Sequence, residues 1–118
     1  MEIDEAIMAF SQSEKIKAGL ISISQALELL RGLAEGEKRG GEKIINVLLS
    51  MIDHEIKLAR TVTRHEGWDD AGPYIDKAMV MINSGVGHEA TVHLSKALSK
   101  VTTIGQQSMT FLKEKGLL

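Results

Sequence analysis

The strongest constraint in this sequence is an apolar run near the middle of the chain. Seven of the nine residues from Ile44 to Ile52 are large and apolar. The run lies inside a longer stretch, from Glu42 to Glu66, that contains neither glycine nor proline. A helix that is apolar on nearly all sides is normally covered by other helices. The run therefore predicts the central helix of an all-α core.

Composition agrees with a helical fold and excludes several classes of protein. A chain of 118 residues is expected to form one domain. Its apolar residues are mainly Leu, Ile, Val, Met and Ala, whereas strands would favour more aromatic and β-branched residues. The net charge of −2 argues against a general nucleic-acid binder, which needs a basic surface. The absence of cysteine excludes disulfides and thiolate zinc sites.

The helix boundaries follow from apolar spacing and from glycine and proline. We expect a single helical domain over residues 1–118, with helices at about 3–34, 42–65, 73–83 and 88–115. The clearest seam, in the first helix, consists of Ile16, Leu20, Ile23, Leu27 and Leu30. The glycines between Glu35 and Gly41 are expected to form a turn, and Pro73 is expected in the first turn of the third helix. These elements predict an antiparallel four-helix bundle.

The long seams also predict association between copies of the chain. Heptad-like apolar stripes on two long helices exceed what one short chain readily covers, and exposed stripes of this kind usually mark interfaces. We expect a homodimer or a dimer of dimers to complete the bundle. The alternative is a closed monomeric bundle.

The beginning of the chain bears on localisation. Its first residues, Met1 to Glu5, are acidic where a signal peptide would be basic. No apolar run reaches the roughly 18 residues of a membrane span. We therefore expect a cytoplasmic protein without a membrane partner.

Two short segments resemble a metal-binding motif of a known family. The first is Gln25-Ala26-Leu27-Glu28, and the second is Lys43-Ile44-Ile45-Asn46, which leads into further apolar residues. Their order resembles the MazG-like all-α nucleoside-triphosphate pyrophosphatases, in which one helix carries E-x-x-E and the next opens with E-x-x-D. Acids three residues apart share a helix face, so two such helices offer four carboxylates to Mg²⁺.

The resemblance implies a MazG-like bundle that binds a nucleotide or another phosphorylated small molecule, with Mg²⁺ as the cofactor if there is one. The positions it assigns to ligand binding are Gln25, Glu28, Lys43 and Asn46. Only Glu28 keeps the expected acid, and Lys43 places an ammonium where the ion would lie. A shift of one residue pairs Glu42 with Asn46 and makes Glu28 and Glu42 the candidate metal ligands. We assign no catalytic residue and expect weak or absent pyrophosphatase activity.

Two other functions remain open. A non-enzymatic helical interaction or regulatory module would work through the exposed stripes. The pair Arg60 and His65 matches the R-x₄-H spacing of the HEPN family of helical ribonucleases. His88 and His93 are five residues apart, whereas the zinc motif of metalloproteases requires four, which excludes that site.

Overall fold

The chain consists of helices joined by short turns. The computed structural model describes every residue from Met1 to Leu118 and contains no strand. Its elements are α1 (Ile3–Leu30), α2 (Glu35–Thr63), α3 (Gly67–Asn83), a short 3₁₀ turn η1 (Gly87–Glu89) and α4 (Ala90–Glu114). The prediction of an all-α bundle is therefore confirmed. None of these helices combines the length and the apolar character required to span a lipid bilayer.

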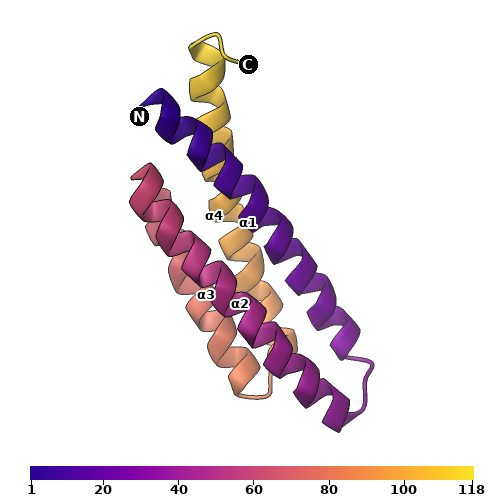
Figure 1. Cartoon of the computed structure of the whole chain (residues 1–118). Coiled ribbons are helices and arrows are strands. Elements are labelled where there is room, and N and C mark those ends of the chain that lie inside the picture. Colours follow the sequence, from indigo (N-terminus) through magenta and orange to yellow (C-terminus); the bar gives the residue numbers. More distant parts are fainter.

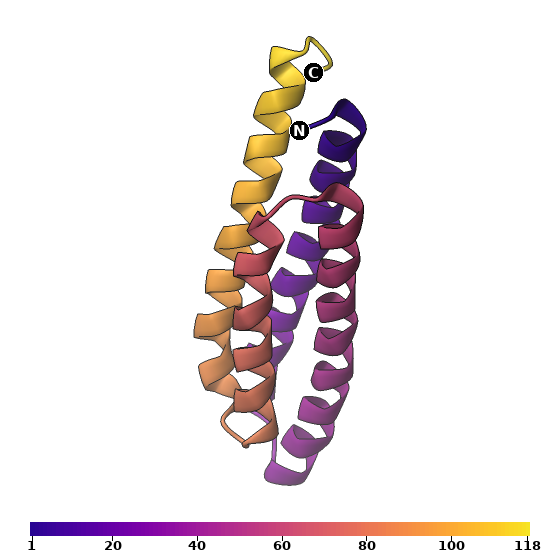
Figure 2. The same cartoon turned by 90° about the vertical axis from the view of Figure 1, so that its left-hand side faces the viewer.

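The four helices form an elongated bundle of 53 × 22 × 18 Å in which successive helices run in opposite directions (Figure 1). Each helix packs against two neighbours, so that α1 and α3 both contact α2 and α4. We call the end that holds the α1–α2 and α3–α4 turns the lower end, and the end that holds the α2–α3 turn the upper end. Figure 2 shows that the start of α1 and the end of α4 reach past the α2–α3 turn at the upper end.

The predicted seam of α1 forms one wall of the core. Its members Ile16, Leu20, Ile23, Leu27 and Leu30 are all buried. The facing side of α4 carries small residues, which allow the two helices to approach closely. A Cβ atom on Gly105 would lie only 2.7 Å from the Ser13 hydroxyl oxygen, so the approach requires glycine at this position.

The second helix begins earlier than the sequence predicts. Glu35 to Gly41 is helical in the structure, although its glycines predicted a turn. Each glycine costs about 1 kcal/mol relative to alanine in a helix interior. Glu35 and Glu37 favour the first turn through the helix dipole. The connection to α1 is therefore reduced to residues 31–34.

The third helix also begins earlier, at Gly67 rather than at Pro73. Pro73 lies inside the helix and leaves the carbonyl of Asp69 without its usual donor. Trp68 compensates for this loss because its side chain is only 1% exposed in the core. Burial of an aromatic ring of this size outweighs one missing backbone hydrogen bond.

The prediction that the Ile44–Ile52 run is buried on all sides is wrong. Ile45 and Leu49 are buried, but Ile44, Val47 and Met51 are exposed to between 59% and 65%. A helix in a four-helix bundle always keeps one outer face, and this chain has no fifth helix to cover it. The apolar run therefore forms part of the core and part of the surface.

Candidate functional site

Two adjoining clefts lie at the lower end of the bundle, where the turns bring α2 close to α3 and α4. The larger cleft has a volume of about 520 Å³ and lies between α2 and the end of α3. The smaller one lies between the α1–α2 turn and η1. Glu42 lines both clefts, and Gly85 of the α3–α4 turn also borders both. The clefts are thus two parts of one polar region centred on Glu42.

The Glu42 carboxylate is buried without a partner. The residue is only 9% exposed, and none of the side-chain hydrogen bonds or ion pairs of the structure involves its carboxylate. Gly87 makes room for it, because a Cβ atom at this position would lie 2.8 Å from one carboxylate oxygen of Glu42. The carboxylate borders both clefts, so water or a ligand can reach its oxygens from there.

Asn46 lies one turn further along α2 and has a second unpartnered acceptor. Its amide nitrogen donates a hydrogen bond to the side-chain oxygen of Asn83 at the end of α3. Its own side-chain oxygen is buried and has no donor. Two acceptors near the larger cleft thus have no donor in the protein: the Glu42 carboxylate, which borders the cleft, and the Asn46 side-chain oxygen, which is closed off from solvent.

The structure brings together only part of the set predicted from the sequence. Lys43 and Asn46 line the larger cleft together with Glu42. Gln25 and Glu28 lie exposed on α1 and line neither cleft. The Glu28 carboxylate instead pairs with Arg31 on its own helix, at 3.3 Å.

These residues do not fit a magnesium site. No group of three or more His, Asp or Glu side chains in the structure could hold a metal ion. Mg²⁺ in proteins normally requires one or two carboxylates with room for water and phosphate oxygens. Glu42 is the one carboxylate that lines the larger cleft, and the neighbouring Lys43 and Arg39 oppose a bare cation.

The other walls of the larger cleft could not be identified from the sequence. Asn83, Ser84 and Gly85 border it from the end of α3. In the sequence these residues form a simple helix stop. Nothing local indicates that the stop lies against α2, because that contact depends on how α3 packs in the bundle.

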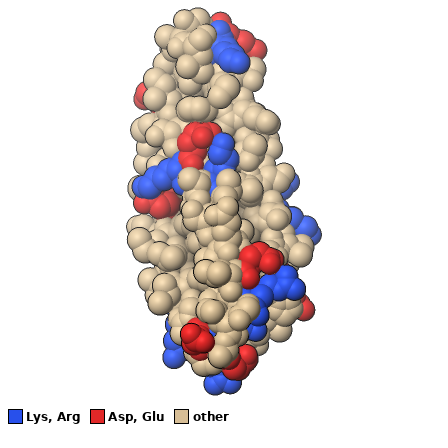
Figure 3. All heavy atoms as spheres, turned by 90° about the vertical axis from the view of Figure 1, so that its right-hand side faces the viewer, with Lys and Arg blue, Asp and Glu red and all other residues tan.

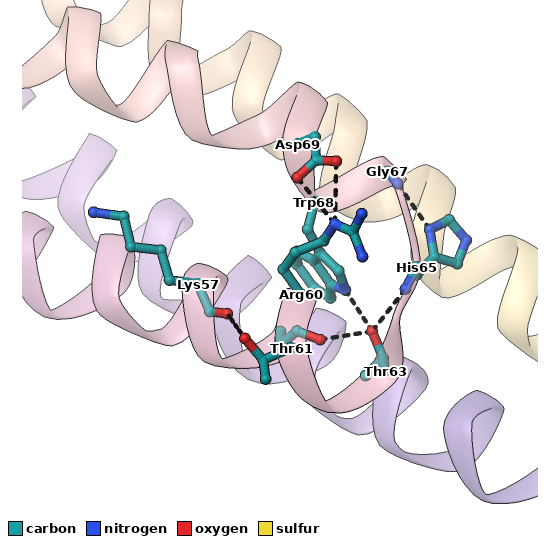
Figure 4. Close-up of polar contacts among 9 residues, drawn as sticks. Lys57, Arg60, Thr61, Thr63, His65, Gly67, Trp68 and Asp69 are labelled. Carbon is teal, nitrogen blue, oxygen red and sulfur yellow. Dashed lines mark hydrogen bonds and ion pairs between the residues drawn. The ribbon is translucent and has the colours of Figure 1, made fainter.

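The residues of the proposed ribonuclease motif have structural partners at the upper end (Figure 4). The Arg60 Nε atom donates to both carboxylate oxygens of Asp69, at 3.0 and 3.1 Å. The His65 Nδ1 atom accepts the Gly67 backbone N–H at 3.0 Å, so the ring proton resides on Nε2, which faces Gln107 at 2.9 Å. Both side chains fasten the start of α3.

A third region is the outer surface shared by α1 and α2. The segments Ala18–Leu27 and Ile44–Ile52 contain no charged residue. They lie side by side, since a Cβ atom on Gly19 would be 3.0 Å from Ile52 Cδ1. A mainly apolar groove of about 390 Å³ runs between them. We call the exposed side chains of these two segments, together with Leu58 and Val62 further along α2, the α1–α2 face.

A small polar cluster interrupts this groove. The Glu55 carboxylate of α2 pairs with Lys15 of α1 at 3.2 Å and accepts a hydrogen bond from Gln12 at 3.2 Å. The Gln12 hydrogen bond, followed by the interaction with Lys15, lowers the pKa of Glu55 below its ordinary value. Glu55 therefore remains charged but has partners within its own chain.

Comparison with protein-family models, with curated proteins and with solved structures finds no match for this chain. The resemblance to the MazG-like family accordingly stays a prediction from the two motif segments. What the structure establishes is an all-helical bundle with a polar cleft at one end and an apolar face on one side.

Proposed function

We propose that the chain is a non-catalytic helical module that pairs with a second copy of itself through the α1–α2 face. The observation that carries the proposal is the exposure of large apolar side chains on α2, most fully at Ile44, Val47 and Met51. Leu48 and Met51 of the same helix line the groove with α1, whose residues from Ala18 to Leu27 carry no charge. Contiguous apolar surface of this kind usually marks an interface.

The spacing on α2 suits a second α2 helix. The outward positions 44, 48, 51, 55, 58 and 62 follow steps of four and three, which is the spacing of helices that pair along a seam. The steps read the same in both directions. Two antiparallel copies related by a twofold axis near residue 53 therefore place Ile44 opposite Val62 and Leu48 opposite Leu58.

The charges on this face also allow self-pairing. Glu55 is the one charged residue among the outward positions, and Lys15 of the same chain already neutralises it. The same twofold arrangement places it opposite Met51 of the second copy. Figure 3 shows the side on which α1 lies in Figure 1: uncharged atoms cover most of it, and the charges form small groups of mixed sign. No block of like charge on that side would repel a second copy.

Measurement of the mass in solution tests the proposal. We expect wild-type protein to have twice the mass of one chain in size-exclusion chromatography with light scattering. Leu48→Glu should weaken the dimer about 100-fold, because an unpaired charge would be buried against Leu58 of the second copy. The matched control is Val80→Glu on α3, where the wild-type side chain is equally apolar and 60% exposed.

Substitutions at Met51 test the register of the pair. In the twofold arrangement this residue faces Glu55 of the second copy, so Met51→Glu should dissociate the dimer more strongly than Met51→Lys. A monomeric wild-type protein would contradict the proposal. So would a dimer that Leu48→Glu and Val80→Glu weaken equally.

Pyrophosphatase and ribonuclease activities stay predictions with less support. The carboxylates expected for Mg²⁺ do not converge, and Arg60 and His65 are engaged in structural contacts. Assays of pyrophosphate release with Mg²⁺ and nucleoside triphosphates, and of RNA cleavage, decide both. Turnover in either assay that depends on Glu28 or His65 would replace the proposal of a non-catalytic module.

A further inference from the structure

The larger cleft at the lower end offers acceptors inside and donors outside. On the inside are the Glu42 carboxylate and the side-chain oxygen of Asn46, neither of which has a partner. Acceptors in largely buried side chains nearly always receive a hydrogen bond, so a Glu42 carboxylate without a donor at the side of a cleft requires an explanation. A ligand that supplies N–H groups from the cleft would satisfy the Glu42 carboxylate.

The mouth of the cleft has the opposite character. Arg39 and Lys43 border it and are exposed on α2. Their side chains carry only donors and a positive charge, so they favour an anionic group. The same charges disfavour a bare metal ion beside Glu42. The cleft therefore selects for a molecule that is positive at its inner end and negative at its outer end.

We propose that this cleft binds a small molecule with an ammonium or guanidinium group at one end and a phosphate or carboxylate at the other. The cationic group pairs with Glu42, while the anionic group lies between Arg39 and Lys43. The volume of about 520 Å³ is within the range of small-molecule sites. The binding site does not depend on the proposed dimer, because it uses the flank of α2 that faces α3.

Isothermal titration calorimetry with bifunctional probes, and with the separate halves of one of them, tests the proposal. The bifunctional probes are O-phosphoethanolamine and L-arginine, which differ in both the cationic and the anionic group. Ethanolamine and inorganic phosphate supply each half of the first probe alone. We expect at least one bifunctional probe to bind. O-Phosphoethanolamine should bind more tightly than ethanolamine or phosphate alone, and the preferred bifunctional probe identifies which pair of groups the cleft accepts.

Substitutions assign the binding to the cleft. Glu42→Gln should weaken the preferred bifunctional probe by about 10- to 100-fold, since it removes a charge-assisted contact. Lys43→Met should weaken the same probe and abolish any binding of phosphate alone. Glu14→Gln, which changes an exposed carboxylate on α1, is the control and should leave the affinity unchanged.

Two results would overturn the assignment. One is the absence of binding of both bifunctional probes at millimolar concentration. The other is binding that does not depend on the cationic group. Such binding would be seen if Glu42→Gln kept the wild-type affinity, or if phosphate alone bound as tightly as O-phosphoethanolamine. Neither result bears on the dimer, whose test uses residues of the α1–α2 face.

Discussion

The polar side chains in the interior of the bundle have hydrogen-bond partners at its upper end but not all of them have partners at its lower end. At the upper end the Thr63 hydroxyl donates to the Ala59 carbonyl at 2.7 Å and accepts from the Trp68 indole N–H at 3.0 Å (Figure 4). It also accepts the His65 backbone N–H at 3.3 Å. At the lower end the Glu42 carboxylate has no partner, although the residue is only 9% exposed.

The difference separates polar groups that stabilise the fold from polar groups that remain available to bind a ligand. A satisfied buried network stabilises one arrangement of the chain, so Thr63, His65 and Trp68 hold the α2–α3 turn in place. Unsatisfied acceptors cost stability without ordering anything, and such positions in natural proteins are concentrated at functional sites. A ligand is therefore expected at the lower end, and substitutions of polar groups at the two ends should change stability in different ways.

The largest effect is expected at Trp68. Trp68→Ala removes the largest fully buried side chain and should lower the free energy of unfolding by about 3–5 kcal/mol. The measurement is urea denaturation followed by circular dichroism. Val92→Ala on the exposed surface of α4 is the control and should stay within about 0.5 kcal/mol of wild type. A loss below 1 kcal/mol at Trp68 would show that the upper end does not anchor the bundle.

Thr63→Val tests the hydrogen-bond network apart from packing, because the two side chains have nearly the same shape. The substitution leaves the Trp68 indole N–H without an acceptor, so we expect a loss of about 1–3 kcal/mol in denaturation experiments. Thr63→Ser keeps the hydroxyl and should lose less. Equal losses for both variants would assign the effect to packing rather than to the polar network.

Two adjacent glycines in the first turns of α2 test how tightly the lower end is packed. A Cβ atom on Gly40 meets nothing within 4 Å, so Gly40→Ala should stabilise the protein by about 1 kcal/mol. A Cβ atom on Gly41 would lie 2.3 Å from Leu30 Cδ2. Gly41→Ala must displace that side chain and should be about 1 kcal/mol less stable than Gly40→Ala. Equal thermal midpoints would show that Leu30 moves freely.

Glu42→Gln is expected to have the opposite sign from the changes at the upper end. It removes a buried charge that has no partner and should raise the free energy of unfolding by up to about 1 kcal/mol in the absence of ligand. The control is Glu14→Gln, an exposed carboxylate whose loss should have little effect. A clear loss of stability at Glu42 would mean that the carboxylate has a structural partner in solution, such as Lys38, which also lines the smaller cleft.

Much of the fold could be predicted because side-chain spacing fixes which residues share a helix face. The seam from Ile16 to Leu30 is an example, and all five of its members are buried. The sequence predicts later starts for α2 and α3 because local glycine and proline signals do not reflect the packing that extends both helices. Burial of Trp68 decides where α3 begins, and that burial exists only once α2 and α4 are in place.

The candidate site was only half accessible to sequence reasoning. Lys43 and Asn46 line the same cleft, as residues three apart on one helix share a face. Asn83 is 37 residues away from its partner Asn46, and no local pattern links the two. The composition of the apolar run favours burial on all sides. The run itself does not reveal how many other helices are available to cover it.

The smallest expected effect concerns Glu55, the counterpart of Glu42 that has partners. The Gln12 hydrogen bond and then Lys15 lower its pKa in the folded chain, so its contribution to stability is present above the ordinary carboxyl pKa and is lost as the pH falls through the lowered value. Glu55→Gln should therefore lose less stability than wild type between neutral and acidic pH. Because the side chain is partly exposed, the difference should be small, and urea midpoints at several pH values measure it. Parallel pH profiles for the two proteins would contradict the assigned interaction, and with it the view that Glu55 is satisfied within its own chain while Glu42 is not.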